Sequence, residues 1–355
     1  MEKLDHKNSE RNSGMELLRI LAILMIISVH YLDASGGGIL AQPFSPSFNI
    51  LSARALESFA IIGVNLFVLI TGYFGCTSRG LNLRRFVNLI LVVAFWGLLL
   101  FFHDLSAGTP FSFALLARSL FPYMFGSLWY CRVYFILLFI APFLNILISD
   151  LTKRGLCSVT AVLMVLFSLL PSFVPAFENA AGYDIISFVM LYFIGATVRL
   201  SIDKKPSKLL SVLLYFVCSA VTAVFSIYGD GLSYWGYDFI SCVLASVFLF
   251  LAFCQINFRS RFINYLGKMT FGIYILNVSF PNLYTKFVVR EDYFTSKYFI
   301  VHFLVCVFGF FIVGTVCETI RTGIFRFTVD PLLDKIPFVN KRLFTKIGKQ
   351  HSTMN

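Results

Sequence analysis

The sequence has few charged residues and no cysteine pair with the spacing of a metal or redox site. Charged residues make up 13% of its 355 positions and hydrophobic residues 58%, whereas soluble domains average about 25% and about 45–50%. Its eight cysteines lie almost all in apolar stretches, and no two form a Cys-x-x-Cys motif. We therefore expect neither a disulfide framework nor a metal site. The composition excludes a soluble enzyme, a disordered chain and a disulfide-rich secreted module.

Long apolar stretches dominate the chain. A membrane-spanning helix needs about 20 mostly apolar residues, and ten stretches are long enough to qualify. They lie at residues 15–33, 59–75, 86–102, 128–148, 156–175, 185–200, 208–228, 238–256, 270–289 and 299–320. We therefore predict an all-α polytopic membrane protein with about ten transmembrane helices.

The distribution of Lys and Arg predicts the orientation of these helices. With the N-terminus inside, 22 of the 29 basic residues fall on the inner side, 5 fall on the outer side, and Arg19 and Arg132 lie within spans. Inner loops are typically enriched in Lys and Arg, so we predict that both termini are cytoplasmic. The net charge of +11 then reflects topology, and the expected partner is the lipid bilayer, with no nucleic acid.

This topology divides the chain into three parts. We predict a cytoplasmic N-terminal tail at residues 1–14, a transmembrane domain at 15–320 and a basic amphipathic cytoplasmic tail at 321–355. The last segment mixes Lys and Arg with Phe, Leu and Ile. An interfacial position on anionic lipid is favoured for it over a partner-binding role.

The first span carries three ionisable residues, Glu16, Arg19 and His30. Such residues cost about 2.5–3.5 kcal/mol each at the centre of a membrane helix. Arg19 and His30 are eleven residues apart and so share a helix face, about 16 Å apart along the axis, and Glu16 is placed to pair with Arg19. They could be residues that reach toward the headgroups, but the aligned set favours a functional stripe, with His30 suited to proton transfer.

Two further groups of residues are candidate ligand-binding positions. Arg79, Arg84 and Arg85 cluster in the first inner loop and would suit a polyanion such as a nucleotide pyrophosphate, although ordinary inner-loop charge explains them as well. Trp129, Tyr130 and Arg132 open the fourth span. They would suit a sugar or an anionic group as well as an aromatic belt at the membrane surface. Asn277, deep in an apolar stretch of the ninth span, is a further candidate substrate-binding residue.

Four stretches taken together resemble the acyltransferase 3 family, the integral-membrane acyltransferases that modify surface polysaccharides. They are ELLRILAILMIISVH, with its Arg–ten residues–His spacing, then NLFVLITGYF, LWYCRVYFILLFIAPFLN and YLGKMTFGIYIL. The stretches run from residue 16 to 276 in the family's order. The ten-span layout is also like the family's, and bacterial members that decorate capsular, lipid-linked or exopolysaccharide sugars look most similar.

The resemblance implies a multi-pass protein of the bacterial plasma membrane that uses acyl-CoA, in the common case acetyl-CoA, as a co-substrate and holds no tightly bound cofactor. The acceptor would be a hydroxyl of a polysaccharide or of its lipid-linked precursor. The family's essential His falls on His30 and its partner Arg on Arg19, while Glu16 fills a position where many members have Asp. Its basic loop motif falls near Arg84 and Arg85, without the usual Arg–two residues–Arg spacing. Relatives often have His where this chain has Asn277.

On this resemblance His30 would act as general base on the acceptor hydroxyl or carry the acyl group transiently. Arg19, held by Glu16, would orient the thioester or stabilise developing charge. The main alternative is a proton-coupled transporter or flippase for a glycan or a lipid-linked sugar, because ten spans with an intramembrane Arg and His fit a carrier equally well. A membrane scaffold is a second alternative.

Overall fold

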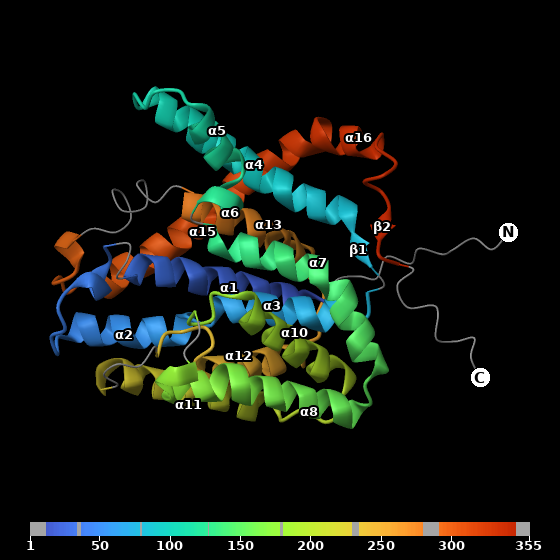
Figure 1. The fold of residues 1–355 in the computed structure, drawn as a ribbon. Coiled ribbons are helices and arrows are strands. Elements are labelled where there is room, and N and C mark those ends of the chain that lie inside the picture. Colours follow the sequence, from blue (N-terminus) through green and yellow to red (C-terminus); the bar gives the residue numbers. More distant parts are fainter. Residues whose placement is uncertain are drawn as a thin grey trace, which may run out of the picture.

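The computed structural model describes residues 12–33, 37–78, 80–126, 128–177, 180–228, 234–279 and 291–345. Most of these residues lie in helices, and the main helices form a bundle (Figure 1). The main helices are α1 (Ser13–Leu32), α2 (Phe48–Ala60), α3 (Gly63–Gly75), α4 (Leu83–Ser106), α7 (Trp129–Asp150), α8 (Lys153–Met164), α10 (Ile185–Leu200), α11 (Lys208–Tyr228), α12 (Ile240–Phe253), α13 (Arg261–Ser279) and α15 (Phe299–Phe327).

Shorter elements connect or extend these helices. They are η1 (Ile39–Ala41), α5 (Phe113–Leu120), α6 (Pro122–Phe125), the π-helical η2 (Val165–Leu169), α9 (Leu170–Phe173), η3 (Pro175–Phe177), η4 (Glu291–Tyr293) and α16 (Val329–Asp334), together with the strands β1 (Leu81–Asn82) and β2 (Arg342–Leu343). The two strands form one small antiparallel pair.

Seven segments of the described chain are long and apolar enough to cross a membrane. They are α1, the α2–α3 pair, α4, α7, the α8–α9 run, α11 and α15. The helices α10 and α12 are apolar but shorter, and α13 carries basic residues at its start. These elements correspond to the ten predicted stretches. The prediction of an all-α polytopic membrane protein is confirmed.

Three predicted spans have clearly different bounds in the structure. The tenth, expected at 299–320, continues in α15 to Phe327. The second begins at Phe48 instead of residue 59, because α2 precedes α3 and is separated from it only by the turn at Ile61 and Ile62. The ninth was expected at 270–289, but α13 covers Arg261–Ser279, and 280–289 lies outside the described residues. Hydropathy misplaced this span because the first turns of α13 carry polar side chains that bond to other helices.

Helix α1 lies inside the bundle and contacts α2, α3, α13 and α15. Two glycines of neighbouring helices permit the closest of these contacts. A Cβ atom at Gly63 of α3 would lie 2.7 Å from the Ala22 carbonyl oxygen, and one at Gly267 of α13 would lie 2.3 Å from the Glu16 carboxylate. Small residues let membrane helices approach closely. The polar stripe of α1 therefore faces other helices instead of lipid.

Candidate active site

The contact between α1 and α13 sets the position of His30. At the start of both helices, Ser13 Oγ donates to Asn264 Oδ1 over 2.8 Å and accepts from the Ser260 backbone N–H over 2.9 Å. At the other end, His30 contacts Asn277. Ser13 and Ser260 are 247 positions apart in sequence, as are His30 and Asn277. A parallel arrangement of two helices in constant register therefore places these pairs together.

The partner of His30 determines which ring nitrogen is free to react. His30 Nδ1 lies against Asn277 Oδ1, and an amide oxygen can only accept a hydrogen bond. Nδ1–H therefore donates to it, which leaves the lone pair on Nε2. Asn277 is 4% exposed, and its Nδ2 has no hydrogen-bond partner among the described residues. The two side chains thus present one proton acceptor, His30 Nε2, and one buried hydrogen-bond donor, Asn277 Nδ2.

The other ionisable residues of the stripe lie nearer the start of α1. Arg19 Nη1 donates to Glu16 Oε1 over 2.5 Å, which is the predicted ion pair. Glu16 is buried, whereas Arg19 is partly exposed, and the Arg19 guanidinium lies 5.9 Å from the centre of the Phe74 ring. Glu16 thus holds one end of the guanidinium while the rest remains accessible from the neighbouring space.

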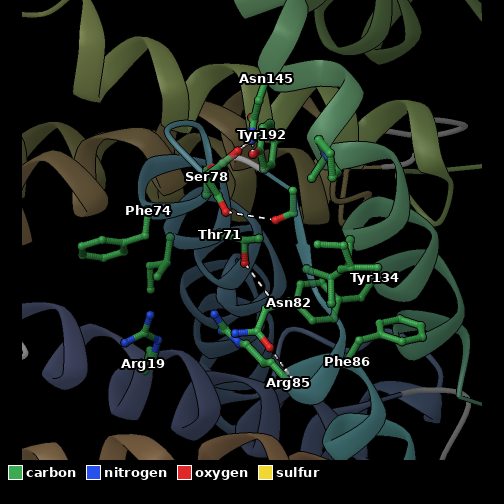
Figure 2. A pocket seen from close by; sticks show the side chains of 17 residues that line it. Arg19, Thr71, Phe74, Ser78, Asn82, Arg85, Phe86, Tyr134, Asn145 and Tyr192 are labelled. Atoms are coloured by element: carbon green, nitrogen blue, oxygen red, sulfur yellow. Dashed lines mark hydrogen bonds between the residues drawn. The ribbon is translucent and has the colours of Figure 1, made fainter. Parts of the chain in front are cut away.

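Two adjoining cavities open onto Arg19. The arginine cavity has a volume of about 210 Å³ and is lined by Arg19, Arg85, Phe86, Asn145 and Tyr192 among others. In Figure 2, Arg19 and Arg85 lie at one end of this cavity and Asn145 and Tyr192 at the other. The tyrosine cavity, about 280 Å³, is lined by residues that include Glu16, Lys268, Tyr130 and Tyr274. Residues common to both linings are Arg19, Ile70, Thr71, Arg85 and Tyr134.

A smaller histidine cavity, about 20 Å³, contains His30 and is lined also by Trp129 and Tyr237. It shares Ile26 and Tyr274 with the tyrosine cavity. The three cavities therefore follow one another from the beginning of α1 to His30. Arg19 lies in the first two and not in the third, so the structure separates it from His30 along the helix.

Aromatic residues surround the histidine cavity. The ring of Trp129 lies 4.3 Å from that of Tyr183 and 5.4 Å from that of Tyr237. Tyr183 is 45% exposed, so this cluster extends from the surface to His30. Tyr130 stacks on Tyr134, with ring centres 5.4 Å apart, and lines the tyrosine cavity. Of the predicted residues on α7, Trp129 and Tyr130 therefore reach the cavities.

Arg132, by contrast, is exposed and does not contribute to the linings of these three cavities. The structure does not bring it to the candidate site. It lies on the same helix as Trp129 and Tyr130, but successive helical residues point in directions about 100° apart.

The predicted basic cluster of Arg79, Arg84 and Arg85 likewise lies only partly at the candidate site. Asn82 caps α4 by accepting a hydrogen bond from the Arg85 backbone N–H over 3.0 Å. Arg85 lines both the arginine and the tyrosine cavities. Arg84 instead pairs with Asp334 and donates to Asn340, so its side chain is engaged by the C-terminal segment. Arg79 lies outside the described residues.

Besides the tyrosines already described, the structure adds residues that the sequence did not single out for the site. Lys268 and Tyr134 line the tyrosine cavity. Glu57, on α2, is only 5% exposed, and it lay just before the predicted start of the second span. Burial raises the pKa of Tyr183, its hydrogen bond with Tyr237 lowers this pKa, and the Asp33 and Glu57 carboxylates raise it. Tyr183, in the aromatic cluster beside the histidine cavity, is therefore a neutral phenol with two carboxylates in its surroundings.

Such a bundle, with an imidazole, an ion pair and linked cavities among its helices, defines an integral-membrane protein with internal space for a ligand. The profile of the acyltransferase 3 family, described as an acyltransferase domain, matches residues 12–319. The chain belongs to this family, and it is a membrane acyltransferase. No curated protein and no solved structure matches the chain.

The contact between His30 and Asn277 leads to a testable prediction about catalysis. Asn277→Leu removes the acceptor that orients the ring and should lower kcat about tenfold, the scale of one hydrogen bond, with little change in KM. Asn277→Asp keeps an oxygen acceptor for Nδ1–H and should retain more activity than Asn277→Leu. Steady-state kinetics of both variants checks this, with Ser279→Ala on the same helix as the control. Equal kcat for Asn277→Leu and the wild type would show that Asn277 does not position His30.

Proposed function

We propose that the protein transfers an acyl group, in the common case acetyl, from acyl-CoA to a sugar hydroxyl of a surface polysaccharide, an exopolysaccharide or its lipid-linked precursor. We further propose that it does so in a bacterial plasma membrane with both termini in the cytoplasm. The observation that carries this proposal is the series of cavities from the basic end of the bundle to His30.

The end of this series near Arg19 suits the donor. Arg19, Arg85 and Lys268 line the tyrosine cavity, where Glu16 neutralises only part of their charge. Arginine and lysine are the usual partners of phosphate groups. The long, narrow pantetheine arm of CoA would extend from these cations past Tyr130 and Tyr274 and bring the thioester to the histidine cavity.

The other end suits the acceptor. Aromatic faces and buried carboxylates are groups that contact and hydrogen-bond sugars, and Trp129, Tyr183 and Tyr237 form such a surface beside His30. In our mechanism His30 Nε2 takes the proton of the sugar hydroxyl as its oxygen attacks the thioester carbonyl. The buried Nδ2 of Asn277 would donate to the carbonyl oxygen as charge develops there. The carbon–sulfur bond then breaks, and the imidazolium returns the proton to the CoA thiolate.

The test is transfer of label from radiolabelled acetyl-CoA by purified full-length protein, with a cell-envelope glycan extract as acceptor. We expect label in the glycan, together with free CoA in equal amount. Label that accumulates on the wild-type protein but not on His30→Ala when no glycan is present would show that His30 carries the acyl group instead of acting as a base. The absence of both CoA binding and label transfer in well-folded protein would overturn the proposal and favour a glycan carrier.

A further inference from the structure

The C-terminal segment lies beyond the region that the family profile matches, which ends at residue 319. Residues 329–345, here called the strap, contain α16 and β2. β2 pairs with β1 at the start of α4, with Asn82 opposite Arg342 and Leu81 opposite Leu343, and the pair lies at one end of the bundle in Figure 1. Asp334 of the strap also pairs with Arg84. The strap is thus attached to the loop before α4 by two kinds of contact.

The strap forms part of the wall of a large cavity at this end of the bundle. This entrance cavity has a volume of about 950 Å³, and the strap contributes Arg342, Phe344 and Thr345 to its lining. Small-molecule and cofactor sites typically measure about 300–1,000 Å³. The entrance cavity shares Ser78, Gly80, Pro142 and Asn145 with the arginine cavity. It therefore extends the series of cavities outward from the membrane domain.

The lining of these two cavities is positively charged. Lys153 and Arg342 line the entrance cavity, and Arg19 and Arg85 line the arginine cavity. Among the described residues that line either one, none is Asp or Glu. Lys153 donates to Asp203 over 2.8 Å, a carboxylate outside both linings, whereas Arg342 projects from the strap into the entrance cavity wall. A cleft with one sign of charge attracts ligands of the opposite sign.

The ring of Phe344 lies near Arg342 in the lining of the entrance cavity. Phe344 has a φ of 66°, in the left-handed region that is unfavourable for a non-glycine residue. Its ring centre lies 5.3 Å from that of Phe143 on α7. The backbone turns immediately after β2, and this turn places an aromatic side chain in the wall next to Arg342. Cations together with an aromatic face suit the phosphates and base of a nucleotide.

We propose that the strap completes the donor site, and that Arg342 binds a phosphate of the adenine nucleotide part of acyl-CoA. This inference rests on the proposed function, because it assigns a further residue to the same donor. The adenosine part of the nucleotide occupies the entrance cavity, its diphosphate reaches Arg19 and Arg85 in the arginine cavity, and the pantetheine arm continues through the tyrosine cavity toward His30. Arg342 acts on binding and takes no part in the acyl transfer itself.

The test compares Arg342→Gln with Lys341→Gln in the full-length protein. The two variants lose the same charge from adjacent exposed positions of the strap, but Lys341 does not line the entrance cavity. In calorimetric titrations with CoA we expect Arg342→Gln to weaken binding about tenfold, the scale of a charge-assisted hydrogen bond, and Lys341→Gln to bind as the wild type does. KM for acetyl-CoA should rise to the same extent while kcat stays unchanged.

A second acyl donor, shortened so that it has no nucleotide, tests whether Arg342 contacts that part of acyl-CoA. Acetyl-pantetheine lacks the nucleotide, so the wild type and Arg342→Gln should use it equally well. If Arg342→Gln binds CoA as tightly as the wild type, the strap proposal is wrong while the proposed function stands. It is wrong too if the variant loses only its retention of phosphatidylglycerol, since the strap would then bind lipid headgroups. A wild type that does not bind CoA would overturn the proposed function itself.

Discussion

Replacing His30 with alanine is expected to lower acyl transfer by about 10²–10⁴-fold, the contribution typical of a positioned acid or base. His30 is the imidazole that lines the histidine cavity, and its Nε2 lone pair is directed by the hydrogen bond from Nδ1–H to Asn277. Because the side chain is only partly buried, its truncation should leave the fold intact. Single-turnover transfer from labelled acetyl-CoA to glycan measures the effect.

His103 provides the matched control for this substitution. It lies near the end of α4 and contacts Asp104, and it lines none of the three cavities. His103→Ala should therefore transfer label at the wild-type rate. CoA binding should persist in His30→Ala, because the cations that we assign to the donor lie in other cavities. Wild-type turnover by a well-folded His30→Ala protein would rule out the mechanism proposed here.

The second large effect is expected on stability, where α4, α13 and α15 meet. Glu318 of α15 is 1% exposed. It accepts a hydrogen bond from Trp96 Nε1 of α4 over 2.7 Å and two from Arg321 Nε over 2.9 and 3.0 Å. Replacing Glu318 with alanine leaves the Arg321 guanidinium buried without its carboxylate. Removal of one partner from a buried pair costs about 3–5 kcal/mol, so we expect a large loss of thermal stability.

Gly272 tests the same contact from the opposite side. A Cβ atom at this position of α13 would lie 1.8 Å from the Glu318 carboxyl carbon, so Gly272→Ala must displace this carboxylate from its hydrogen bonds with Trp96 and Arg321. Gly309→Ala on α15 is the control, because a Cβ atom there meets nothing within 4 Å. Melting of detergent-solubilised protein should show a much lower Tm for Gly272→Ala and little change for Gly309→Ala. Equal melting of the two variants would contradict the packing described here.

Much of the fold could be predicted because hydropathy is a local property. An apolar stretch long enough to span a bilayer must satisfy its backbone hydrogen bonds internally, so it forms a helix whatever its neighbours are. The alignment of Arg19 with His30 followed from helical geometry alone, and the structure shows the Glu16–Arg19 ion pair. The bounds of α2 and α13 were less accurate, because polar residues at their ends are stabilised by contacts with other helices.

The candidate site was only partly predictable. Arg84 and Arg85 are adjacent and equally basic, yet Arg85 lines the cavities while Arg84 pairs with Asp334, 250 positions away in sequence. Asn277 was predicted to bind substrate, which stays a prediction, and only the structure shows that it bonds to His30. Lys268 appeared in the sequence as one inner charge among many. Its place in the cavity lining depends on how α13 is rotated against α1.

The sequence by itself determined that this is a helical membrane protein, that one helix carries Glu16, Arg19 and His30 on a common stripe, and that the chain resembles the acyltransferase 3 family. These features depend on residues within one helix or on motifs that run in order along the chain. The tertiary structure alone decided which side chains share a cavity, that Asn277 directs the His30 ring, and that the strap borders the entrance cavity. Such contacts join residues some 250 positions apart, and they depend on the packing of whole helices.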